Sequence, residues 1–134
     1  MAKTFMAGSL VVLFLAFAPA TAQELDTGKA LYDEFCVACH GSNGKGGGEI
    51  SDIISATVPD LSKLAAGNDG EFPMLKVIHV IDGRTGVRAH GGPMPLYGNI
   101  FSATAAAEGR GYGSVVETRG RLLSLALYLE SIQE

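Results

Sequence analysis

The stretch "FCVACHG", residues Phe35–Gly41, contains both cysteines of this 134-residue chain and one of its three histidines. Cys36 and Cys39 are separated by two residues, and His40 directly follows the second cysteine. Two thiols and an imidazole at this spacing suit three kinds of chemistry: a redox-active dithiol, half of a zinc site, or covalent attachment of a haem. The rest of the sequence has to distinguish among these three possibilities.

Haem attachment fits the surrounding sequence better than the other two. A zinc site needs about four ligands, but the chain has no second pair of cysteines or histidines at ligand spacing. A disulfide-exchange motif usually follows a strand and opens a helix, whereas this motif follows a predicted helix and precedes a glycine-rich loop. Residues three apart face the same side of a helical turn, so both thiols can form thioethers while His40 ligates the iron. The sequence favours one covalently bound haem c per chain.

The second axial position of a haem iron has several candidate ligands downstream of the motif. Met94 lies between two prolines in a stiff loop segment, where a methionine has no evident role in core packing. Met74 instead belongs to the apolar stripe of a predicted helix, and His79 is expected to be an exposed helix residue. We favour Met94 as the ligand. His90 is the runner-up, and His/His ligation would give a lower reduction potential.

Residues 1–22 have the features of a secretory signal peptide. Lys3 is followed by a charge-free segment that ends in the small-residue pattern Ala-Thr-Ala at Ala22. An uncleaved membrane anchor is the alternative, because the charge-free run is just long enough to be considered. Its strongly apolar part covers only about residues 10–17, a length typical of a signal peptide. We therefore predict cleavage after Ala22, a mature domain of residues 23–134, and a periplasmic location.

The charge balance of the mature domain excludes one class of partner and suggests another. Without the predicted signal peptide, nine lysines and arginines remain against fourteen aspartates and glutamates, a formal net charge of −5. An acidic domain without a basic patch is a poor candidate for binding nucleic acid. It suits a redox protein partner that presents a basic surface. We expect a monomer with no stable membrane insertion after cleavage.

Four helices are predicted from apolar periodicity and from start and stop signals. They cover about residues 27–37, a short stretch after Asp60 that stops at Gly67, residues 73–83 and residues 114–133. Asp26 or Thr27 is expected to cap the first helix, and Pro73 to open the third at its first position. Ser114 and Glu117 are expected to form a capping box on the last. No alternating run typical of a strand is present, so the predicted fold class is all-α, with long glycine-rich loops.

With these residues identified, the chain resembles a class I (monohaem) cytochrome c over essentially all of residues 23–134. Its two anchors are the motif of residues 36–40 and the Met94 loop, which stand in the order and rough separation of that family. The segment from "VPDL" to "PLYG" is similar to a bacterial subgroup with P-D-L, F-P, I-D-G-R and A-H-G-x-x-M-P elements. The resemblance implies a cytochrome c fold wrapped around one covalently bound haem.

A second correspondence lies outside the haem motif. The family has a glycine and an aromatic residue on its first helix, at the point where this helix crosses the last one. Gly28 and Tyr32 lie eight and four positions before Cys36, as that pattern requires. Leu125 and Tyr128 match the partners on the last helix. The resemblance therefore implies a close crossing of these two helices.

The resemblance also implies roles for further residues around the haem. The carbonyl of Pro59 is the best match for the acceptor of the axial histidine's other ring nitrogen, a contact that fixes the ring and raises its basicity. Arg84 and Arg88 match residues that pair with haem propionates, although solvated loop charges are an equally good interpretation. Tyr97 stands where the subgroup often has tryptophan, and is expected to pack on or hydrogen-bond near a propionate.

The function implied is that of a one-electron carrier between periplasmic or membrane redox partners, not an enzyme. One alternative keeps the haem but makes the chain a subunit of a periplasmic dehydrogenase or oxidase complex. A large apolar patch around the haem edge would favour this alternative. A less favoured alternative is a ligand-binding or peroxidase-like haem protein, which would need an open distal position.

Overall fold

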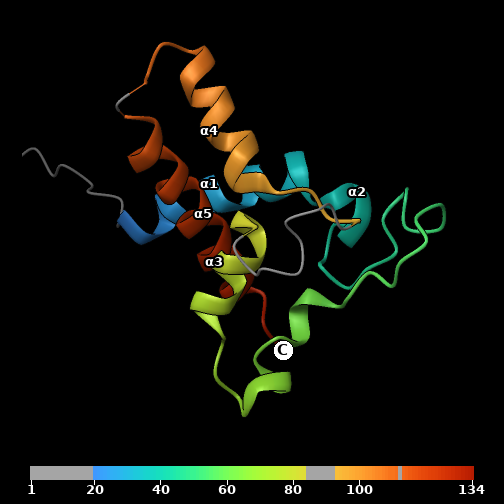
Figure 1. The fold of residues 1–134 in the computed structure, drawn as a ribbon. Helices are drawn as coiled ribbons and strands as arrows, with labels where there is room; N and C mark the ends of the chain where they lie inside the picture. Colours follow the sequence, from blue (N-terminus) through green and yellow to red (C-terminus); the bar gives the residue numbers. More distant parts are fainter. Residues whose placement is uncertain (1–19, 84–92, 112) are drawn as a thin grey trace, which may run out of the picture.

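The computed structural model describes residues 20–83, 93–111 and 113–134. These residues form five α-helices and two short 3₁₀ turns, with no strand among them, which confirms the predicted all-α class. The elements are α1 (Ala20–Phe35), α2 (Val37–His40), η1 (Leu61–Lys63), η2 (Ala66–Asn68), α3 (Met74–Asp82), α4 (Tyr97–Ala107) and α5 (Ser114–Ser131) (Figure 1). Within these ranges, no helix combines the length and the apolar character needed to cross a membrane. Residues 1–19 of the expected signal peptide lie outside the described ranges.

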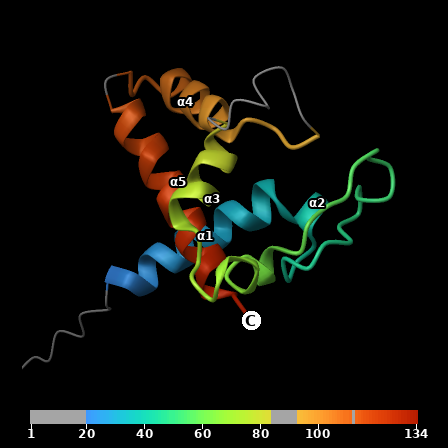
Figure 2. The ribbon, with the colours of Figure 1, turned by 60° about the horizontal axis from the view of Figure 1, so that its bottom comes forward.

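The first and last helices cross in close contact, as expected (Figure 2). Gly28 of α1 is buried at the crossing, where an added Cβ would lie 2.8 Å from both Ser124 C and Tyr128 Cβ, and still nearer to the Ser124 carbonyl oxygen. Only a residue without a side chain allows the backbones to approach so closely. The ring of Tyr32, which is fully buried, lies 5.3 Å from that of Tyr128, centroid to centroid. The predicted glycine–aromatic crossing is therefore confirmed.

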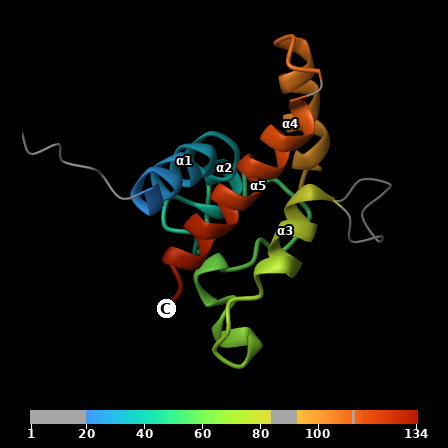
Figure 3. The ribbon, with the colours of Figure 1, turned by 90° about the vertical axis from the view of Figure 1, so that its left-hand side faces the viewer.

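Helices α3 and α4 also pack on α5, so α5 is the central element of the core. Its buried side chains include Leu122, Leu125, Ala126 and Leu129, and Phe101 of α4 is fully buried against the same core cluster. Figure 3 shows α4 beside the beginning of α5, and the segment of residues 61–72 (green) beside its end. The core thus supports a site formed by residues of all five α-helices and of the connecting loops.

The boundaries of the first predicted helix are wrong at both ends. Helix α1 already includes Ala20, and the Thr27 hydroxyl donates to the Gln23 carbonyl at 2.9 Å inside the helix, so Thr27 is not a cap. The helix ends at Phe35, because Cys36 has φ −116° and interrupts the α-helical run before α2 begins. The interruption separates the attachment motif from α1 as a turn of its own.

The other helix predictions have mixed outcomes. Helix α3 lies between Pro73 and Gly83, which cap it, as predicted to within one residue. The short helix after Asp60 is instead two 3₁₀ turns, and Gly67 lies inside the second of them rather than ending a helix. The Asp60 carboxylate accepts from Ser62 N at 2.9 Å and caps the first turn.

The predicted capping box on the last helix is wrong, and neither the four-residue α2 nor α4 was predicted as a helix of its own. Helix α5 begins at Ser114, but its hydroxyl donates to the Gly111 carbonyl, and Glu117 pairs with Arg121 instead of reaching back to the helix start. Helix α4 was not predicted, because its alanine-rich sequence has little amphipathic contrast. Its buried residues nevertheless follow a helical stripe: Tyr97, Phe101 and Ala105.

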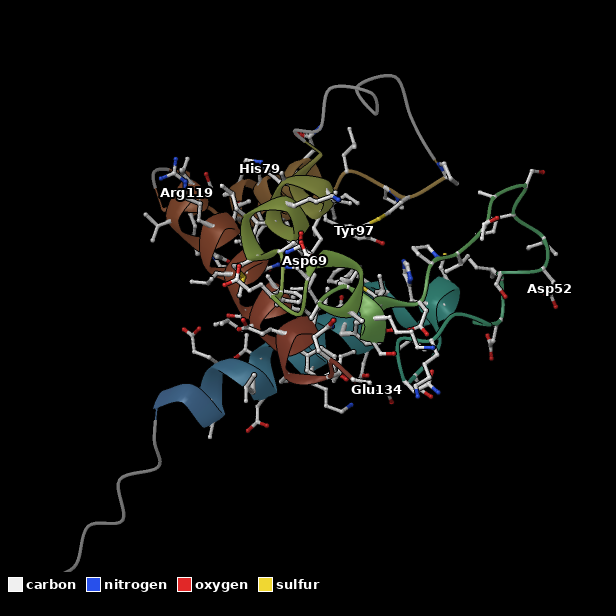
Figure 4. The ribbon with its side chains drawn as sticks, turned by 90° about the horizontal axis from the view of Figure 1, so that it is seen from below. Asp52, Asp69, His79, Tyr97, Arg119 and Glu134 are labelled. Atoms are coloured by element: carbon white, nitrogen blue, oxygen red, sulfur yellow. The ribbon has the colours of Figure 1, made fainter. Side chains whose placement is uncertain are left out.

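The loop of residues 41–60 extends away from the helices and is tied to α2 at its base. Gly48 N donates to Cys39 O at 3.1 Å, and Ile50 N donates to Ala38 O at 3.0 Å. A Cβ on Gly48 would collide with the Val37 and Ala38 carbonyls, so glycine is required for this contact. Asp52 lies at the outer end of the loop (Figure 4). The returning part of the loop leads back to the attachment motif.

Candidate functional site

The attachment motif forms a compact helical turn on the wall of a cavity. Cys39 N and His40 N both donate to the Cys36 carbonyl, at 3.1 and 2.9 Å. Cys36 is buried and Cys39 half-buried, both thiols are free, and both residues line the cavity together with His40. The turn therefore presents two thiols and one imidazole to the same space, the arrangement that two thioether bonds and one iron ligand require.

The environment of Cys36 argues against a redox dithiol. Burial, with a smaller contribution from the neighbouring Cys39, raises the pKa of the Cys36 thiol to about 12. Thiol–disulfide exchange needs a thiolate near neutral pH, which catalytic sites obtain by lowering the pKa. Cys36 is therefore unsuited to exchange chemistry. A zinc site is equally unsupported, because the described residues contain no cluster of three or more His, Cys, Asp or Glu side chains.

His40 is held in the state that an iron ligand requires. Its side chain is almost wholly buried, and Nδ1 lies 3.4 Å from the Pro59 carbonyl oxygen. Because a carbonyl oxygen can only accept, the Nδ1 proton must be the donor, which leaves the lone pair on Nε2. Burial lowers the pKa of His40, and the contact with Pro59 offsets this only in part. The neutral imidazole is thus favoured, and Pro59 occupies the position that the resemblance implies.

The cavity has a volume of about 350 Å³, within the range of about 300–1,000 Å³ typical of small-molecule and cofactor sites. Most of its wall is apolar, with contributions from the 41–60 loop, η1 and its flank, α3 and α5; they include Ile54, Val58, Leu64, Val77, Val80 and Leu129. Apart from His40, the charged or titratable lining includes Lys63 and Lys76, and no described carboxylate lines the cavity. An apolar wall with cations and two thiols suits a flat, apolar macrocycle that carries carboxylates and is held covalently.

Met94 is the methionine that lies on the cavity wall. It lines the cavity together with Pro93 and Pro95, its two neighbours, and packs against the core cluster. Met74 packs against the core but does not line the cavity, and neither does the half-buried His79. The other candidate ligand, His90, lies outside the described residues, as do Arg84 and Arg88, the expected partners of the propionates.

Tyr97 connects the Met94 segment to the attachment motif. Its hydroxyl donates to the Phe35 carbonyl at 2.7 Å, and its ring contacts the Phe35 ring edge-on with centroids 5.8 Å apart. Tyr97 is buried and lines the cavity, and burial raises its pKa to about 12, so the hydroxyl stays protonated. This hydrogen bond ties residue 97 to the residue before Cys36, while the expected role of Tyr97 near a propionate stays a prediction.

Some residues of the site were not identified from the sequence. Lys63 and Lys76 gave no signal, because isolated lysines in helical or loop segments normally face solvent. Ile54 and Val58 lie in a loop without apolar periodicity, and their contribution depends on how the loop folds back. Val80 could have been found, since it is part of the apolar sequence of a correctly predicted helix.

Comparison with known proteins supports the same assignment as the geometry. The family model described as Cytochrome c matches residues 25–107, more than half of the chain. Searches of curated proteins and of solved structures gave no significant match. The matched residues contain the attachment motif, the cavity lining from α3 and the loops, and Met94. The chain therefore belongs to the cytochrome c family, whose members carry covalently attached haem c.

Proposed function

We propose that this protein is a one-electron carrier whose haem iron is ligated by His40 and Met94. Haem-based electron transfer is the general function of the family. The observation that carries the finer assignment is that His40 and Met94 line the same cavity from different segments, while Met74 and His79 do not line it. Closing both axial positions with protein ligands leaves no site for a substrate, so the chain is a carrier and not an enzyme.

The residues of the site have separate roles in this function. Cys36 and Cys39 hold the haem through thioether bonds, and the Pro59 carbonyl orients His40 through Nδ1. The bound haem supplies an iron centre that alternates between Fe(II) and Fe(III). The apolar cavity wall and the thioether of Met94 both favour the reduced, less charged state and raise the potential. Arg84 and Arg88 are proposed to pair with the propionates.

Methionine ligation can be tested by comparing two variants of the haem-loaded protein. In the oxidised wild-type protein we expect the weak red absorption band of methionine-to-iron charge transfer. Met94→Ala should abolish this band, because it removes the thioether from the cavity wall. Met74→Ala is the matched control and should keep the band, because Met74 packs on the core outside the cavity. Loss of the band in the Met74 variant alone would overturn the assignment.

Binding of carbon monoxide distinguishes the carrier from a ligand-binding haem protein. With both axial positions closed, the reduced wild-type protein should bind carbon monoxide slowly, and Met94→Ala should bind it rapidly. Rapid binding by the wild-type protein would favour the ligand-binding alternative. Among the described residues, exposed large apolar side chains such as Ile53, Leu75 and Val116 do not line the cavity.

We further propose that the protein is exported to the periplasm and docks transiently on a redox partner with a basic surface. The support is the signal-peptide pattern that ends at Ala22 and the formal net charge of −5 for residues 23–134, from nine basic and fourteen acidic residues. N-terminal sequencing of the exported protein should begin at Gln23. Electron exchange with the partner should slow as ionic strength rises.

A further inference from the structure

The end of the chain forms hydrogen bonds with the segment that follows Pro59. In Figures 1 to 3 the C-terminus lies beside the green segment that contains η1. The Gln133 side chain spans the contact: Oε1 accepts from Ala65 N at 2.9 Å, and Nε2 donates to Leu61 O at 2.8 Å and to Leu129 O at 2.6 Å. One amide thus joins α5 to both ends of a five-residue segment.

Three neighbouring contacts extend this connection. Glu134 N donates to Ser62 O at 2.9 Å, and the Glu134 carboxylate pairs with Lys45 Nζ at 2.5 Å. Leu61 N donates to Gly44 O at 2.7 Å. Both backbone polar groups of Leu61 are therefore engaged, one by the loop that follows the attachment motif and one by Gln133.

Leu61 is two residues from Pro59, whose carbonyl faces His40. The Nδ1–O distance of 3.4 Å is long for this contact, since N–H···O bonds usually measure about 2.7–3.2 Å. A contact already longer than this range weakens sharply with further separation or tilt. Proline contributes no N–H of its own to hold its position. The position of the Pro59 carbonyl therefore depends on how firmly the residues after it are held.

We propose that Gln133 is a positioning residue for the axial histidine. By holding Leu61 and Ala65, its amide keeps the Pro59 carbonyl within reach of His40 Nδ1. That contact raises the basicity of the imidazole, and a more basic ligand stabilises Fe(III) over Fe(II). Gln133 thereby lowers the reduction potential from a position outside the cavity lining. The inference rests on His40 being an axial ligand, as proposed above.

The test replaces Gln133 by methionine in the haem-loaded protein. Gln133→Met keeps the length and approximate volume of the side chain but removes its three hydrogen bonds. We expect a higher midpoint potential than in wild type. We also expect solvent exchange of the His40 Nδ1 proton, followed by NMR of the reduced protein, to accelerate about tenfold, in line with the loss of one hydrogen bond.

Ser131→Ala is the matched control, because Ser131 is two residues earlier, exposed, and bonded only to Tyr128 O of its own helix. It should leave both the potential and the exchange rate at wild-type values. Gln133→Asn retains the amide on a shorter stem that cannot reach all three partners. It should give a smaller rise in potential, and it provides the test if the methionine variant fails to fold.

The inference would be overturned if Gln133→Met lowered the melting temperature without changing the potential or the exchange rate. Gln133 would then have a structural role only. An equal rise in potential in Ser131→Ala would overturn it as well. Failure of the proposed function is distinguishable from both results. It would show in the wild-type protein itself, whose oxidised spectrum would lack the signature of His/Met ligation.

Discussion

The crossing of α1 and α5 at Gly28 gives a sharp prediction for stability. In Gly28→Ala, the new methyl group would meet the Ser124 carbonyl and the base of the Tyr128 side chain. Neither can move aside as the end of a flexible side chain could, because one is backbone and the other is a Cβ. The two helices must separate locally, and the buried contact between Tyr32 and Tyr128 opens with them.

The magnitude follows from two opposing effects. Overpacking a tight contact costs about 1–3 kcal/mol, and the backbone collision at Gly28 belongs at the upper end of that range. Alanine in a helix gains about 1 kcal/mol over glycine. The net loss is about 2 kcal/mol, which corresponds to a melting temperature lower by about 6–10 °C for a domain of this size.

Gly120→Ala is the matched control, because Gly120 lies in α5 and an added Cβ would meet nothing within 4 Å. It should gain about 0.5–1 kcal/mol and raise the melting temperature by a few degrees. Thermal unfolding of the two haem-loaded variants, followed by circular dichroism, provides the comparison. If Gly28→Ala is as stable as wild type or more stable, the reasoning about the crossing is refuted.

Two further substitutions probe the surroundings of the site. Tyr97→Phe keeps the ring but removes the donor to the half-buried Phe35 carbonyl, so guanidinium unfolding should show a loss of about 0.5–1.5 kcal/mol. An unchanged midpoint would contradict this role of the hydroxyl. Hydrogen bonds from Ser62 hold the pKa of the Asp60 carboxyl below its ordinary value. The ionised carboxylate therefore stabilises the folded protein fully above about pH 4, and this contribution is lost as the pH falls through the lower pKa of the folded state. The difference in urea midpoint between wild type and Asp60→Asn should therefore be largest at pH 6 and should shrink towards pH 3, and a constant difference would exclude this linkage.

Helix α3 shows how far local signals reach. Pro73 and Gly83 stand at its ends and act locally, so the helix was predicted to within one residue. Helix α4 carries no comparable signals, and its buried residues Tyr97, Phe101 and Ala105 become a stripe only when α5 packs beside them. Ser114 stands where a capping residue is expected, but its hydroxyl donates to the Gly111 carbonyl instead of accepting from the helix start. Local patterns therefore fail where tertiary or neighbouring partners outcompete them.

The sequence by itself determined the chemistry of this protein, because that chemistry is local in the chain. Cys36, Cys39 and His40 occupy one helical turn, and any helical conformation of these residues turns both thiols towards the same side. The close helix crossing at Gly28 was implied by the resemblance to the cytochrome c family, in which a glycine and an aromatic residue stand at this spacing before the motif. The chemistry of the motif needs no knowledge of distant segments.

Only the tertiary structure decided which further groups support the site. The resemblance had already matched Pro59 to His40, 19 residues earlier, but Gln133, which reaches Ala65 and Leu61 across 68 and 72 residues, was not identified from the sequence. The sequence does not show which group a carbonyl or a side-chain amide will bond to, because nearly every residue offers similar backbone groups. Which backbone groups meet depends on how the loops fold back onto the helices, and the packing of α1, α3 and α4 on α5 fixes this arrangement.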